Sequence, residues 1–213
     1  MPHTQVTTKE VFKFDELSDS AKEKARDWWR SCERQDCDDL IDRDDIETIA
    51  NILGIEFDCR PVKLMGGGTR YESKIWYSGF SSQGDGACFE GTYSYAKGSA
   101  KKIREHAPLD IRLHSIADQL QTLQRKHFYK IGARCTHSGH YYHSGCMHVE
   151  VWLNDQMDAP RDVEEETRDI LRSFADWIYR QLESEYEYRM SNENVDESIR
   201  INEYEFDENG RIA

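Results

Sequence analysis

Side chains that can bind a metal are concentrated in one short segment of the sequence. Within fourteen residues it holds Cys135, His137, His140, His143, Cys146 and His148. Thiolate and imidazole groups are the ligands that zinc prefers, but structural zinc sites usually draw on paired ligands such as C-x2-C with a distant second pair. The segment has no such pair, so we predict a polar loop without a metal. A metal-dependent enzyme built on His137, His140, His143 and Cys146 remains an alternative.

A glycine-rich segment, Gly79 to Ala87, is the second candidate. Loops that hold a phosphate lead from a strand into a helix and carry a positive charge. This segment is expected to join two strands, and it carries Asp85, so it does not fit a phosphate loop. Asp85 can instead close the turn by accepting hydrogen bonds from backbone amides. In the alternative interpretation the loop is exposed, and Phe80, Gln83 and Asp85 contact a partner.

Strand alternation predicts a third site, on one face of a sheet. If the apolar residues point into the core, the opposite face carries tryptophans, carboxylates, an arginine and a histidine. These residues are Trp76, Glu90, Arg134, His148, Glu150 and Trp152. Such a mixture suits a planar or charged ligand, and it equally suits the charge-paired outer face of a sheet. Glu90 and Glu150 would be an acid–base pair if their separation allowed them to cooperate.

No short catalytic motif supports an enzyme. The sequence lacks G-x-S-x-G, H-E-x-x-H, G-x-G-x-x-G and D-F-G. Ser, His and Asp residues occur, but no spacing among them selects a catalytic triad. We therefore predict a protein that is not an enzyme and that needs no cofactor.

The positions of these candidates depend on two predicted β-hairpins. The first joins residues 71–80 to 87–95 and the second joins 128–136 to 147–153. Helical periodicity predicts helices over residues 18–29, 46–53, 99–123 with a break at Pro108, 163–189 and 195–202. Shorter strands are expected near residues 7–14, 55–57 and 204–206. We predict a single α+β domain over residues 1–213, with a mainly antiparallel sheet and helices packed on one face.

The composition fits a folded acidic protein. The chain has 213 residues and a net charge of −13, and its 5 Trp, 11 Tyr and 8 Phe supply core-forming rings that a disordered chain lacks. The negative charge repels nucleic acid, because DNA binding requires Lys and Arg that neutralise phosphates. Two interpretations of the charge stay open, a well-solvated surface and an acidic face for a basic partner.

The sequence contains no signal for a membrane or for secretion. No run of eighteen apolar residues is present, and the first residues do not form a signal peptide. Six cysteines are too few for a disulfide framework, and we expect them to be reduced, as in the cytoplasm. The acidic segment Asp36–Asp45 has no clear periodicity, so its order is not predicted.

A resemblance to a known family is carried by the stretches Phe14–Arg26, Tyr77–Gly91, Trp177–Glu183 and Asn202–Gly210. They resemble small acidic proteins of tailed bacteriophages and prophages, whose members often carry the label "antitoxin of a toxin–antitoxin stability system". The resemblance implies a phage origin and the cytoplasm of the infected bacterium. It supplies no catalytic residues.

Three functional hypotheses follow. The first is an accessory binding protein, antitoxin-like or anti-defence, that binds and neutralises a bacterial host protein, a basic one if the acidic surface is the contact. The second is a small-molecule binder that sequesters a nucleotide-type defence signal on the face of Trp76, Arg134 and Trp152. The third is the metal-dependent enzyme. Aromatic residues are enriched at interfaces, which favours a homodimer, although the same rings could instead belong to the core.

Overall fold

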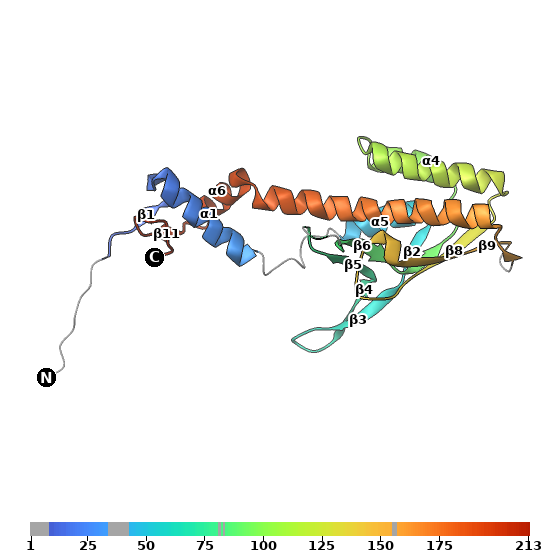
Figure 1. The fold of residues 1–213 in the computed structure, drawn as a ribbon, viewed down its shortest axis with the longest axis horizontal. Helices are drawn as coiled ribbons and strands as arrows, with labels where there is room; N and C mark the ends of the chain where they lie inside the picture. Colours follow the sequence, from blue (N-terminus) through green and yellow to red (C-terminus); the bar gives the residue numbers. More distant parts are fainter. Residues whose placement is uncertain (1–8, 34–42, 81, 83, 155–156) are drawn as a thin grey trace. The chain divides into compact units, whose positions relative to one another are not determined.

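The computed structural model describes residues 9–33, 43–80, 82, 84–154 and 157–213 (Figure 1). Contacts divide the chain into two compact units, which are described separately. The central unit covers residues 42–183, and the terminal unit combines residues 1–41 with residues 184–213. The single domain over residues 1–213 stays a prediction.

A five-stranded sheet, antiparallel at every step, forms the base of the central unit. In spatial order its strands are β10 (Met157–Asp158), β9 (Met147–Leu153), β8 (Ile131–His137), β7 (Gly91–Tyr93) and β2 (Ile55–Phe57). The β8–β9 pair is the second hairpin predicted from the sequence. The short strand β10 has no counterpart among the predicted strands, because two residues are too few to give a strand pattern.

Two further antiparallel ribbons belong to the central unit. They are β3 (Cys59–Lys63) with β4 (Thr69–Ser73), and β5 (Ile75–Ser78) with β6 (Gly86–Phe89). Three chain segments change partners at one residue each. Asp58 separates β2 from β3, Lys74 separates β4 from β5, and Glu90 separates β6 from β7.

These three residues bond to one another in a ring. The N–H of Asp58 donates to the Glu90 carbonyl (2.9 Å), that of Glu90 to the Lys74 carbonyl (3.0 Å), and that of Lys74 to the Asp58 carbonyl (2.7 Å). This three-way junction replaces the simple hairpin predicted over residues 71–95. Only β5 and β6 pair as expected, whereas β4 pairs with β3, and β7 pairs with β2 and β8.

The central unit also contains helices, and the two longest of them lie on one side of the five-stranded sheet (Figure 1). The helices are α2 (Arg43–Leu53), α3 (Ser99–His106), α4 (Ile111–Lys126) and α5 (Arg161–Met190), the last residues of which belong to the terminal unit. The break predicted at Pro108 separates α3 from α4. Asp110 begins α4 by accepting a hydrogen bond from the Leu113 N–H (2.8 Å). The predicted α+β fold is confirmed.

Aromatic rings join α5 to the strands in the core. The Phe174 ring on α5 lies 6.5 Å from Phe57 on β2 and 5.8 Å from Phe89 on β6, measured between centroids. A buried amide joins α4 to β8: Gln124 donates to the Ile131 carbonyl (2.7 Å) and accepts from the Ile131 N–H (3.2 Å). Buried polar groups that are paired in this way specify one arrangement of helix and strand.

The β3–β4 ribbon extends from the central unit as an arm (Figure 1). Side chains on both faces of the arm are exposed, including Tyr71 at 71%. At its tip Leu64 and Met65 precede a run of three glycines. The arm supplies control positions for experiments on the rest of the central unit, since little packs against it.

The terminal unit is a small helical assembly with one pair of strands. Its elements are β1 (Phe12–Lys13), the 3-10 turn η1 (Phe14–Glu16), α1 (Asp19–Glu33), α6 (Asn192–Ile201) and β11 (Glu205–Phe206). Phe14 is buried, and three cations, Lys22, Arg26 and Arg200, lie 5.4–5.9 Å from its ring centroid. The predicted helices and terminal strand are confirmed, and the first strand is limited to two residues among those described.

Two further expectations from the sequence concern the acidic segment Asp36–Asp45 and membrane-spanning helices. Most of Asp36–Asp45 lies outside the described residues, and Arg43 to Asp45 begin α2. Among the helices that the structure describes, none combines the length and the apolar character needed to cross a membrane.

Candidate functional site

Two loops that are far apart in the sequence pack together in the central unit. One connects β5 to β6, and the other connects β8 to β9 through the 3-10 turn η3 (Ser144–Cys146). A Cβ atom at Gly84 would lie 2.6 Å from the Tyr141 ring, and one at Gly86 would lie 2.6 Å from the His143 Cα atom. The His143 backbone leaves no room for a side chain at position 86, and the Tyr141 ring would have to turn aside for one at position 84, so these glycines allow the close approach of the two loops.

Aromatic rings and histidines gather where the loops meet. The ring centroid of His137 lies 5.5 Å from that of Trp76 and 5.4 Å from that of Tyr142. The Tyr141 ring stacks on that of His143 with centroids 6.4 Å apart. His137 also reaches the second loop backbone, because its Nε2 atom is 2.9 Å from the Tyr141 carbonyl oxygen. Tyr141 remains 63% exposed.

The loop between β5 and β6 is fixed from two sides. Phe80 stacks on Tyr179 of α5 with centroids 5.6 Å apart, and the Tyr179 hydroxyl donates to the Gly79 carbonyl (2.9 Å). Burial raises the pKa of Tyr179, so its hydroxyl stays a donor at neutral pH. Asp85 accepts a hydrogen bond from the Ser82 N–H (2.6 Å). Asp85 therefore closes the loop, which is one of the two roles predicted for it.

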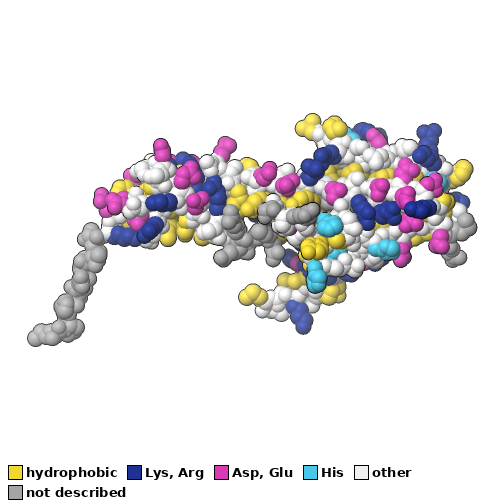
Figure 2. Space-filling view, viewed as in Figure 1, with side chains coloured by type: hydrophobic (Ala, Val, Ile, Leu, Met, Phe, Trp, Pro, Cys, Tyr) yellow, Lys and Arg dark blue, Asp and Glu magenta, His cyan; other side chains and the backbone are white. Residues whose placement is uncertain are grey.

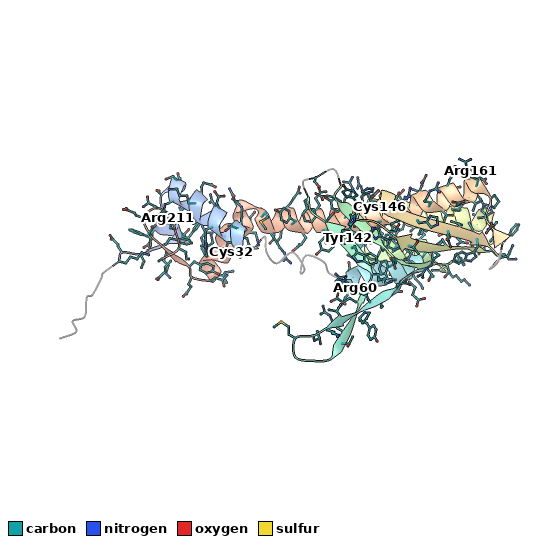
Figure 3. All side chains as sticks on the ribbon, turned by 60° about the horizontal axis from the view of Figure 1, so that its bottom comes forward. Cys32, Arg60, Tyr142, Cys146, Arg161 and Arg211 are labelled. Atoms are coloured by element: carbon teal, nitrogen blue, oxygen red, sulfur yellow. The ribbon has the colours of Figure 1, made fainter. Side chains whose placement is uncertain are left out.

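We call this group the aromatic–histidine surface. It consists of Trp76, Phe80, His137, Tyr141, Tyr142, His143 and Tyr179. Histidines lie beside hydrophobic side chains on this part of the central unit (Figure 2), and Tyr142 and Cys146 are labelled in Figure 3. Tyr, Trp and Phe are the residues enriched at the centre of protein interfaces. The arrangement can thus hold a partner through large rings of low conformational freedom.

A thiol lies beside this surface. The Cys146 Sγ atom is 3.2 Å from Nε2 and 3.8 Å from Nδ1 of His143. Arg172 of α5 fixes the turn by donating to the carbonyls of Gly145 (3.2 Å) and Met147 (2.8 Å). A nucleophilic cysteine is typically paired with a histidine whose second nitrogen is held by a third group. Among the described residues no third group bonds to His143, since both nitrogens face the same sulfur.

The other potential metal ligands diverge. His137 and His148 occupy adjacent rungs of the β8–β9 ladder, so they lie on opposite faces. Burial raises the pKa of the Cys88 and Cys135 thiols to about 12 in each case, which keeps both protonated at neutral pH. Within the described part of the chain, no group of three His, Cys, Asp or Glu side chains could hold a metal ion. The alternative of a metal enzyme finds no centre there.

Residues of the predicted ligand face divide between two places. Arg134, His148, Glu150 and Trp152 share the outer face of the five-stranded sheet, as alternation predicts. Trp76 belongs to the β5–β6 ribbon, where its ring contacts His137. Glu90 lies in the three-way junction.

Several of these side chains already have partners within the protein. Arg134 donates to both carboxylate oxygens of Asp58 (2.9 and 2.5 Å), and this hydrogen bonding raises the pKa of Arg134. Lys74 donates to Glu90 (2.7 Å). Trp152 covers Gly132, where a Cβ atom would overlap its indole. These contacts favour the charge-paired outer face, and ligand binding there stays a prediction.

The sequence predicted both loops as candidate sites, but it did not predict that they contact each other. Phe80 and Asp85 were predicted to contact a partner together with Gln83, which lies outside the described residues. Tyr141, Tyr142 and Tyr179 were not singled out. One feature of the sequence could have indicated the contact between the loops. Gly84 and Gly86 are two residues apart, as are Tyr141 and His143, and in the structure Gly84 faces Tyr141 while Gly86 faces His143.

Comparison with known proteins identifies a family for the chain, but that family has no described activity. A family described as "Domain of unknown function (DUF8835)" matches residues 41–192, which include the whole aromatic–histidine surface. No curated protein and no solved structure matches the chain.

Proposed function

The chain belongs to the DUF8835 family, and we propose that it is a non-catalytic accessory protein that binds and neutralises another protein. The partner would contact the aromatic–histidine surface. This proposal keeps Phe80 at the contact, as the sequence predicted, and adds the rings of Tyr141 and Tyr142. Asp85 would act by holding the loop in shape.

One observation carries the proposal. Two loops separated by more than fifty residues are packed so closely that a Cβ atom at position 86 would overlap the His143 backbone and one at position 84 would overlap the Tyr141 ring, and the result is a group of large rings at the surface. The Tyr141 side chain is 63% exposed in the free protein, so it is available for burial against a partner. Burial of such rings against a partner releases water and supplies most of the binding energy at typical interfaces.

The phage resemblance extends the proposal to the partner. It would be a protein of the infected bacterial host, met in the cytoplasm, and neutralised in an antitoxin-like or anti-defence manner. The net charge of −13 would speed association with a basic partner. The site itself is mainly aromatic, so we expect charge to act on the rate of association and the rings to act on the lifetime of the complex.

The test compares capture by three forms of the protein from a lysate of the bacterial host. One form is wild type. The second is a double variant, Phe80→Ala with Tyr141→Ala, which removes two rings from the aromatic–histidine surface. The third is Tyr71→Ala, which removes a comparably exposed ring from the arm. We expect one host protein that wild type and Tyr71→Ala retain and the double variant loses. That protein, once purified, should lose its own activity when wild type is added. Equal capture by all three forms would refute the site, and capture without inhibition would refute neutralisation.

A further inference from the structure

Helices α4 and α5 run antiparallel within the central unit. At the beginning of α4, Trp177 donates from Nε1 to the Asp110 carboxylate (2.6 Å). At the end of α4, Lys126 lies 3.7 Å from the Glu166 carboxylate. Because residue numbers rise along one helix as they fall along the other, the two helices face each other over most of the length of α4.

A cavity of about 270 Å³ opens between these helices. Arg112, Ser115 and Gln119 line it from α4, and Asp176, Trp177 and Arg180 line it from α5. Trp177 is only 5% exposed, so it forms part of the floor, and its bond to Asp110 holds the indole in place. The volume is just below the range of sites for drug-sized ligands, which suits a smaller molecule.

The two arginines of the cavity are available for a ligand. Among the described residues, neither Arg112 nor Arg180 has a hydrogen bond or an ion pair, although Asp176 precedes Arg180 by one helical turn. Arg161 and Arg168 on the same helix both pair with glutamates four residues away (2.8 and 3.3 Å). A cavity with two free guanidinium groups and one carboxylate is positively charged, in a protein whose net charge is −13.

Guanidinium groups recognise phosphate by paired N–H···O bonds in a fixed fork. Serine and glutamine side chains add neutral donors at the same wall, where Gln119 already donates to Ser115 (2.9 Å). The rigid apolar floor offers a surface for the remainder of a ligand. We propose that this cavity binds a small phosphorylated molecule, with Arg112 and Arg180 on the phosphate group. The site is separate from the aromatic–histidine surface and independent of the proposed partner.

Isothermal titration with three probes tests this inference on the full chain. Adenosine monophosphate and inorganic phosphate should bind saturably, and adenosine should not. The variants Arg112→Ala and Arg180→Ala should each weaken binding about tenfold, as expected for loss of a charge-assisted hydrogen bond. The absence of saturable binding of both phosphate probes, or equal binding of adenosine, would overturn the proposal.

Two further variants separate a specific site from general attraction. Arg125 lies on α4, is exposed, and does not line the cavity, so Arg125→Ala should leave affinity unchanged. Asp176→Asn removes the one carboxylate and should tighten phosphate binding about two- to tenfold. Equal losses for Arg125→Ala and Arg112→Ala, or weaker binding by Asp176→Asn, would contradict the assignment. Circular dichroism of each variant controls for unfolding.

Discussion

The packing of the two loops makes a quantitative prediction at Gly86. An alanine there would place its Cβ atom 2.6 Å from the His143 Cα atom, about 0.8 Å short of ordinary contact. The obstacle is backbone, and the turn that carries it is fixed by Arg172 through the Gly145 and Met147 carbonyls. Neither the β6 strand nor the turn at His143 can move without a loss of stability. Overpacking of this kind costs about 1–3 kcal/mol, partly offset by the roughly 0.5–1 kcal/mol that alanine gains over glycine in a strand.

We therefore expect Gly86→Ala to lower the free energy of unfolding by about 1–2 kcal/mol, which corresponds to about 2–8 °C in the melting temperature of a chain of this size. Urea denaturation followed by circular dichroism measures it. Alanine variants at two other glycines, Gly84 and Gly66, serve as controls. At Gly84 the obstacle is the exposed Tyr141 ring, which can turn away, and at Gly66 nothing lies within 4 Å. Both alanine variants should be nearly neutral. A Gly86→Ala protein as stable as Gly66→Ala would refute the packing of the loops.

Three further predictions concern the core and the outer face. Gln124→Leu leaves buried backbone groups of β8 without partners and should cost about 2–4 kcal/mol in urea denaturation. Arg134→Gln should cost about 0.5–1 kcal/mol, because it breaks a partly exposed ion pair with Asp58, and an unchanged denaturation midpoint would contradict that contribution. The Cys88 and Cys135 thiols have a pKa of about 12 in the fold against 9.0 as the ordinary value, so stability should be constant below pH 9 and fall as the pH rises towards 12. A double alanine variant should show a shallower decline, and the part that remains includes Tyr93, whose pKa burial also raises to about 12.

Local patterns in the sequence located most elements correctly for identifiable reasons. Gly54 ends α2 at a φ of +88°, where glycine is favoured, and Pro108 separates α3 from α4. The alternation of β8 and β9 set the two faces of the sheet because one face is buried. These features depend on residues close together in the chain, which is why the sequence alone sufficed.

The three-way junction and the site could not be reached in the same way. Asp58, Lys74 and Glu90 look like ordinary charged strand residues, and only their mutual backbone bonds make each strand change partner. The aromatic–histidine surface likewise arises from a contact between Gly84 and Tyr141, over fifty residues apart. Pairing over such distances is decided by the whole fold and leaves no local periodicity.

The central claim is that the aromatic–histidine surface binds a protein partner. The most direct measurement is the dissociation constant of the purified host protein for wild type, Tyr141→Ala and Tyr71→Ala. A ring at the centre of an interface is worth about 2 kcal/mol or more, so Tyr141→Ala should weaken binding more than about tenfold. Tyr71→Ala, which removes a comparably exposed ring from the arm, should leave the constant unchanged. Equal affinity of wild type and Tyr141→Ala, or a loss confined to Tyr71→Ala, would contradict the claim.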